Sequence, residues 1–190
     1  MLDTLLQSNT PRTLRRRIRP ALFAAEAAII AALYVALTYL ASAMGLASMA
    51  IQLRFSEALC MLTVLTPAAV PGMWIGCFLA NLLTGAVAWD IVFGSLATLL
   101  GVLGGRALVL AARRLYPAHP VAAKVTLCLT PLPTVVANAA IIPPVLIYAY
   151  GVGDALPYLI LTVGLGEILS AWGLGLLLLL PMARLRRRAR

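Results

Sequence analysis

The chain has 190 residues, of which 63% are apolar or aromatic and only 11% are charged, and its mean hydropathy is +0.99. Soluble domains carry about 25% charged residues, so this composition excludes an ordinary soluble enzyme, a disordered chain and a secreted disulfide scaffold. It predicts an all-α integral membrane protein. A spanning helix with its turn takes roughly 25–30 residues, so the length predicts about six spans.

The net charge of +9 comes almost entirely from three groups of arginine and lysine residues that flank apolar runs. One group precedes residue 20, another follows residue 183, and the third surrounds an internal break at Arg106, Arg113, Arg114 and Lys124. Basic residues accumulate on the cytoplasmic side of membrane proteins, so we expect both termini in the cytoplasm. The predicted organisation is a basic segment at 1–20, a six-helix transmembrane domain at 21–182 and a basic tail at 183–190.

The predicted spans alternate with short turns in chain order. Their approximate bounds are 21–44, 55–66, 71–83, 90–112, an irregular stretch within 121–150, and 156–180. Asp90 is expected to cap the start of the fourth span. Pro131 and Pro133 interrupt the start of the fifth and Pro143-Pro144 its outer half, so we expect a kinked span that enters the membrane near Pro133.

The predicted topology places six polar side chains in or beside membrane spans, where a polar group costs free energy. An ionisable group inside a span costs about 2.5–3.5 kcal/mol on insertion scales and usually faces a cavity or a partner. We predict that the six form a substrate site near the outer side and the middle of the bundle: Arg54, Glu57, Asn81, Asp90, Asn138 and Glu167. Carboxylates and amides suit a small polar, planar or cationic ligand, because they can pair with a guanine-like or heterocycle edge.

Structural roles are open alternatives for most of these residues. Arg54 and Glu57 would also suit an ion pair, Asp90 a helix cap, and Asn81 and Asn138 hydrogen bonds between helices. Glu167 is the hardest to explain without a functional role, because it lies about a dozen residues into the last span.

The first span carries a strip of small residues. Ala24, Ala28, Ala32 and Ala36 recur every four residues and therefore share one ridge of the helix. Small residues in this pattern let a second helix approach closely in lipid. The strip therefore predicts a docking face for a separate membrane subunit, with internal packing as the alternative.

Several motifs are missing. The chain has no G-x-x-x-x-G-K-[ST], H-E-x-x-H or G-x-S-x-G motif, and its one histidine, His119, falls in the predicted inner loop. We therefore expect no enzymatic activity, no metal and no cofactor. The basic groups lack interleaved aromatic residues and adjoin the spans, so the expected contact is membrane lipid rather than nucleic acid.

The run from Gln52 to Leu59 (QLRFSEAL) resembles the R-x-S-E-A-L motif of the QueT family. Further runs agree in the same order along the chain: TPAAVPG at 66–72, IGC at 75–77, ANLL at 80–83, DIVFGSLATL at 90–99, Asn138, and Gly166-Glu167. The resemblance covers about residues 25–180. The Arg-rich C-terminus and the Pro143-Pro144 step have no counterpart in the family pattern.

This resemblance implies the substrate-binding (S) component of an energy-coupling factor transporter in a prokaryotic cell membrane. It implies six helices, cytoplasmic termini, an outward-facing pocket for a queuosine precursor (a 7-deazaguanine base), and a first-helix alanine strip that meets a transmembrane coupling subunit with two ATPase subunits. Ala24 to Ala36 match that strip. The alternatives are an S component for another vitamin-like heterocycle and a stand-alone proton- or cation-coupled secondary transporter.

Overall fold

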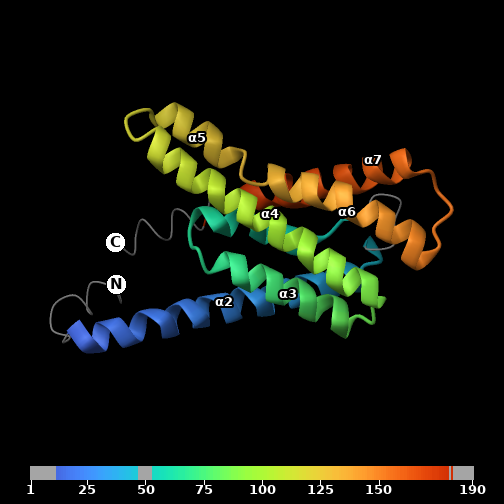
Figure 1. Ribbon diagram of the computed structural model, residues 1–190, viewed down its shortest axis with the longest axis horizontal. Coiled ribbons are helices and arrows are strands. Elements are labelled where there is room, and N and C mark those ends of the chain that lie inside the picture. Colours follow the sequence, from blue (N-terminus) through green and yellow to red (C-terminus); the bar gives the residue numbers. More distant parts are fainter. Residues whose placement is uncertain (1–11, 47–52, 180, 182–190) are drawn as a thin grey trace.

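The computed structural model describes residues 12–46, 53–179 and 181, and these residues form helices joined by turns, with no strand among them. The predicted all-α class is therefore confirmed. In chain order the helices are α2 (Arg12–Ala43), η2 (Phe55–Val64), α3 (Ala69–Leu83), α4 (Ala88–Leu115), α5 (Pro120–Cys128), α6 (Leu132–Tyr150), α7 (Leu156–Glu167) and η3 (Ile168–Leu174) (Figure 1). Gln52 of the QueT-like motif, residues 1–11 of the basic N-terminal segment and the basic tail lie outside the described residues.

Four stretches are long and apolar enough to cross a membrane: Arg19–Ala43, Ala88–Leu115, Val121–Tyr150 and Leu156–Leu179. The chain is therefore a multi-pass membrane protein. Phe55–Val64 and Ala69–Leu83 are apolar but shorter. A 3-10 helix of ten residues rises about 20 Å and an α-helix of fifteen about 22 Å, against a bilayer core of about 30 Å. The count of six spans and the cytoplasmic termini stay predictions.

The fifth predicted span consists of two helices, because α5 ends at Cys128 and α6 begins at Leu132. This break agrees with the expected kink near Pro133. The second expected interruption is wrong, since α6 continues through Pro143 and Pro144 to Tyr150. Proline is tolerated inside membrane helices, where neighbouring helices and local adjustments satisfy the freed backbone groups.

Glycines bring the helix backbones close together. A Cβ atom at Gly76 of α3 would lie 2.7 Å from the Cβ of Tyr34 and 3.0 Å from the Cα of Ala31 on α2. A Cβ at Gly101 of α4 would lie 2.6 Å from the Cα of Thr134 on α6. Such small-residue contacts are the usual means of helix association in lipid. They hold α2 to α3 and α4 to α6.

The centre of the bundle is η2, a 3-10 helix of ten residues in which eight are buried. Runs of more than three or four residues are uncommon for this conformation. At its end the Nη1 of Arg106 donates to the carbonyl of Thr63 at 3.0 Å, and the Nη2 of Arg113 to the carbonyl of Val64 at 3.3 Å. These two guanidinium groups satisfy carbonyls that a helix end would otherwise leave free.

The two ends of the bundle differ in chemistry. The α4–α5 turn, which follows Arg113 and Arg114 in the last turn of α4, lies at the same end as the first turns of α2 (Figure 1). The α3–α4 and α6–α7 turns lie at the opposite end (Figure 1). The polar candidates Arg54, Asn81 and Asp90 belong to elements that begin or end there.

Candidate substrate-binding site

A cavity of about 470 Å³ opens at the end of the bundle that holds the α3–α4 and α6–α7 turns. Its volume is typical of a small-molecule site. Its wall comes from α2, η2, α3, α4 and α6, and its polar lining includes Tyr34, Thr38, Ser56, Arg54, Asn81, Asp90 and Tyr150. Three of the six residues predicted from the sequence therefore face this cavity.

Asp90 lies in the first turn of α4, where Val87 rather than Asp90 occupies the N-cap position and no side chain caps the helix. The helix-cap interpretation is therefore wrong. The carboxylate instead accepts a hydrogen bond from the hydroxyl of Tyr150 at 2.8 Å through Oδ2. Asn81 donates from Nδ2 to the backbone carbonyl of Asp90 at 3.2 Å. The side chains of Asn81 and Asp90 both face Gly94, whose missing side chain leaves them room.

Glu57 is fully buried in the first turn of η2. Its Oε1 accepts hydrogen bonds from the hydroxyl of Tyr34 on α2 and from the hydroxyl of Thr98 on α4, the latter at 3.4 Å. Its neighbour Ser56 accepts a hydrogen bond from Thr38 at 3.0 Å. The start of η2 is therefore held by hydroxyl groups from α2 and α4.

Glu167 ends α7, and the π-helical segment η3 begins directly after it. Such wider turns occur frequently at functional sites. The Oγ of Ser170 in this segment accepts a hydrogen bond from the backbone N–H of Arg54 at 3.0 Å. This contact brings the start of η2 beside the end of α7. Arg54 consequently lies within electrostatic range of Glu57, Asp90 and Glu167.

Four buried carboxylate or amide oxygens have no hydrogen-bond partner in the described part of the chain: Glu57 Oε2, Asp90 Oδ1, Asn138 Oδ1 and Glu167 Oε2. Native structures satisfy most buried polar groups, so unpaired ones need an explanation. All four atoms are hydrogen-bond acceptors. All four also belong to residues that the sequence predicts as ligand contacts.

Asn138 is separate from the other candidates. It is fully buried on α6, and its Nδ2 donates to the carbonyl of Thr134 at 3.1 Å, one turn earlier on the same helix. Glu57, Asn138 and Glu167 lie behind the cavity lining rather than on it.

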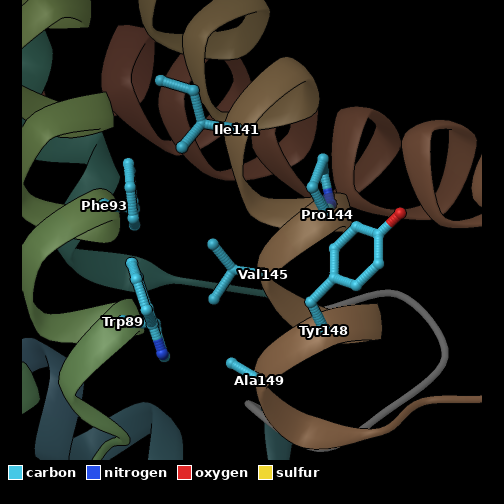
Figure 2. Close-up of a pocket in the computed structure, with 7 residues that line it drawn as sticks. All are labelled: Trp89, Phe93, Ile141, Pro144, Val145, Tyr148 and Ala149. Carbon is cyan, nitrogen blue, oxygen red and sulfur yellow. The ribbon is translucent and has the colours of Figure 1, made fainter.

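A second hollow, a groove of about 420 Å³, lies between α4 and α6. Figure 2 shows Trp89 and Phe93 of α4 on one side and Ile141, Pro144, Val145, Tyr148 and Ala149 of α6 on the other. The rings of Trp89 and Phe93 stack with their centroids 5.7 Å apart. The described side chains that line the groove carry no charge, and their polar groups are the indole N–H of Trp89 and the hydroxyl of Tyr148. The groove therefore offers a polar ligand far fewer contacts than the first cavity does. The polar cavity is therefore the candidate site.

The alanines of α2 divide into two sets. Ala27 and Ala31 are buried, and they face Gly72 and Gly76 of α3. Ala24, Ala28, Ala32 and Ala36 are all exposed. The internal contact between α2 and α3 therefore uses the alanines beside the predicted strip and leaves the strip itself accessible.

Two residues of the site were absent from the sequence prediction. Tyr34 and Tyr150 both line the cavity and both donate to a predicted ligand carboxyl. The available signal was chemical, since a tyrosine hydroxyl in an apolar stretch needs a hydrogen-bond partner when it is buried. Among the described residues, no group of three or more His, Cys, Asp or Glu side chains is arranged to hold a metal ion.

The model of the QueT transporter family matches residues 24–184. The chain belongs to the QueT transporter family. The match covers every described helix from η2 to η3 and most of α2, so it includes all six predicted site residues and the alanine strip. No curated protein and no solved structure matches the chain. QueT is a transporter family, which is consistent with the expectation that the chain is not an enzyme.

Proposed function

We propose that this QueT protein is the membrane-embedded substrate-binding component of an energy-coupling factor importer for a 7-deazaguanine base. One observation carries the choice of ligand: four of the five unpaired buried side-chain oxygens in the described part of the chain are carboxyl or amide acceptors, and the fifth is the hydroxyl of Thr134. The four acceptors belong to Glu57, Asp90, Asn138 and Glu167. A ligand that satisfies them must bring N–H donors. A 7-deazaguanine base carries N–H donors on its guanine-like edge and on its pyrrole ring, and its aminomethyl form adds a cation.

The formal charges of the site support a donor-rich or cationic ligand over an anion. Glu57, Asp90 and Glu167 face one guanidinium, that of Arg54, within electrostatic range. Buried charges need a compensating partner. Three carboxyl groups beside one guanidinium complement the N–H donors of a base or an ammonium group, whereas an anionic ligand would have only Arg54 as a charged partner.

We assign roles to the residues on this basis. Glu57 or Glu167 accepts the N1–H and 2-amino donors of the base, and Asn81 or Asn138 pairs with the carbonyl or pyrrole side. Asp90 neutralises an aminomethyl cation through Oδ1, since its Oδ2 already accepts from Tyr150. The ligand enters from the cavity, whose wall holds Arg54 and Asp90. It reaches the buried acceptor behind this wall when side chains of the lining move aside.

The proposed partners are a transmembrane coupling subunit with two ATPase subunits, which this chain would contact through Ala24, Ala28, Ala32 and Ala36. The exposure of these four alanines supports the contact, because a small-residue ridge lets a partner helix approach closely. The proposal includes six spans with both termini in the cytoplasm of a prokaryotic cell. That orientation makes the cavity face outward.

A second candidate function is a stand-alone proton- or cation-coupled transporter. The buried and unpaired Oε2 of Glu167 favours it, because intramembrane carboxylates serve as coupling-ion sites in such proteins.

Two measurements test the proposal. Purified full-length protein should bind 7-aminomethyl-7-deazaguanine in calorimetry, and Glu57→Gln or Glu167→Gln should weaken binding. A dissociation constant equal to wild type in either variant removes the role of that carboxylate. Uptake of the labelled base should require the coupling ATPases. Uptake that survives ATP depletion but stops when the ion gradient collapses would favour the second candidate and reject the first.

A further inference from the structure

We propose that Tyr34 is a positioning residue, whose hydroxyl fixes the Glu57 carboxyl group so that Oε2 alone is presented to the ligand. This inference rests on the proposed function, in which Glu57 contacts the bound base. It assigns a role in ligand recognition to a side chain of α2 and to a hydrogen bond between α2 and η2.

The geometry distinguishes the two oxygens of Glu57. Oε1 accepts from the hydroxyl of Tyr34 and, at 3.4 Å, from that of Thr98. Oε2 has no hydrogen-bond partner among the described residues. One oxygen is therefore held by two hydroxyl groups from two different helices, and the other remains available as an acceptor.

Tyr34 is itself rigidly placed. Its side chain is 2% exposed, and its Cβ would lie 2.7 Å from a Cβ at Gly76, so the backbone of α3 packs directly against it. Tyr34 also lines the cavity. A side chain fixed in this way restricts the rotamers of Glu57 before the ligand binds. Preorganisation of this kind raises affinity by removing an ordering cost.

The test compares hydroxyl deletions on the same helix. Tyr34→Phe removes the hydroxyl and keeps the ring. Tyr39→Phe is the matched control, because its hydroxyl donates to the carbonyl of Leu83 at 2.8 Å and also joins α2 to α3, away from Glu57. We expect Tyr34→Phe to weaken binding of 7-aminomethyl-7-deazaguanine by about tenfold and Tyr39→Phe by less than about twofold. Thr98→Val, which removes the longer bond, should weaken binding by about twofold to threefold.

A second measurement separates positioning from a merely structural role. The infrared carboxyl band of Glu57, assigned as the band that Glu57→Gln removes, should shift in Tyr34→Phe and stay in place in Tyr39→Phe. Wild-type affinity in Tyr34→Phe overturns the inference. A loss of affinity without a shift of the band also overturns it, because the hydroxyl would then act on the ligand directly or on the fold.

The two proposals fail in different ways. If wild-type protein does not bind the base, the proposed ligand is wrong, and the infrared band still reports whether Tyr34 holds Glu57. If wild-type protein binds and Tyr34→Phe binds equally well, the proposed function stands and only the positioning role is lost. A melting temperature for Tyr34→Phe close to that of Tyr39→Phe shows that the comparison is between folded proteins.

Discussion

Substitution of Gly94 by alanine should weaken ligand binding while the protein stays folded. A Cβ atom at residue 94 would lie 3.0 Å from Asn81 Nδ2 and 3.0 Å from Asp90 Oδ1. Both atoms are ends of side chains, so they can move away, and the required shift is a few tenths of an ångström. The same shift displaces the free acceptor of Asp90 and the amide of Asn81 from the positions proposed for ligand contact.

The expected size follows from the bonds affected. A hydrogen bond to a charged group contributes about 1.5–3 kcal/mol, and each 1.4 kcal/mol corresponds to a tenfold change in dissociation constant. Loss of the Asp90 contact in Gly94→Ala therefore predicts binding weaker by about 10- to 100-fold. Alanine is favoured over glycine inside a helix by roughly 0.5–1 kcal/mol, which offsets the displacement of the side chains. The melting temperature should stay close to that of wild type.

Titration calorimetry with 7-aminomethyl-7-deazaguanine measures the binding, and thermal unfolding in detergent measures the stability. Gly164→Ala on α7 is the matched control, because its new Cβ would meet only the Cβ of Ala139, at an ordinary 3.8 Å. This control should bind the base as wild type does. Wild-type affinity in Gly94→Ala, with folding intact, would refute the proposed contact between the ligand and Asp90 Oδ1.

Three further predictions concern docking and stability. Ala28→Leu on the exposed strip should leave the dissociation constant of the ligand unchanged but reduce both co-purification with the coupling subunit and uptake of the ligand. Ala140→Leu, at an exposed position of α6, should leave co-purification and uptake unchanged. Gly76→Val should lower stability by about 1–3 kcal/mol, measured by thermal unfolding, because the new side chain meets α2 backbone; an unchanged melting temperature would contradict the close α2–α3 contact. Arg106→Met should cost about 1 kcal/mol of stability by leaving the Thr63 carbonyl unpaired, and a change in ligand affinity would contradict its purely structural role.

The clustering of Arg54, Glu57, Asp90 and Glu167 was predictable, because each is a costly residue in an apolar sequence and the positive-inside pattern places each along the membrane normal. Tyr34 and Tyr150 were not singled out, since an aromatic residue in a membrane span is as common in packing or at the interface as in a site. Their role depends on which helix faces them, which the order of elements alone does not specify.

Local conformation was harder to predict than position. The Phe55–Val64 segment is a 3-10 helix and Ile168–Leu174 is a π-helix, yet the apolar sequence of each resembles that of an ordinary α-helix. The three helix types differ in which backbone carbonyl accepts the hydrogen bond of each N–H, and tertiary packing determines which type forms. The continuation of α6 through Pro143 and Pro144 was missed for a related reason. Proline usually ends a helix in soluble proteins, but inside a membrane bundle neighbouring helices can satisfy the backbone groups that it leaves free.

The thickness of α2 has a consequence of its own. Tyr34 faces the cavity, and Ala32, two residues away and about 200° around the helix axis, is exposed on the strip. A single helix, about 10 Å across, therefore forms the whole wall between the site and this surface. At that distance two unit charges interact by about 1.7 kcal/mol if the effective dielectric constant is about 20. A wall this thin cannot electrically insulate the alanine strip from the cavity, so a charged ligand in the cavity beside Tyr34 is felt on the outer surface of α2.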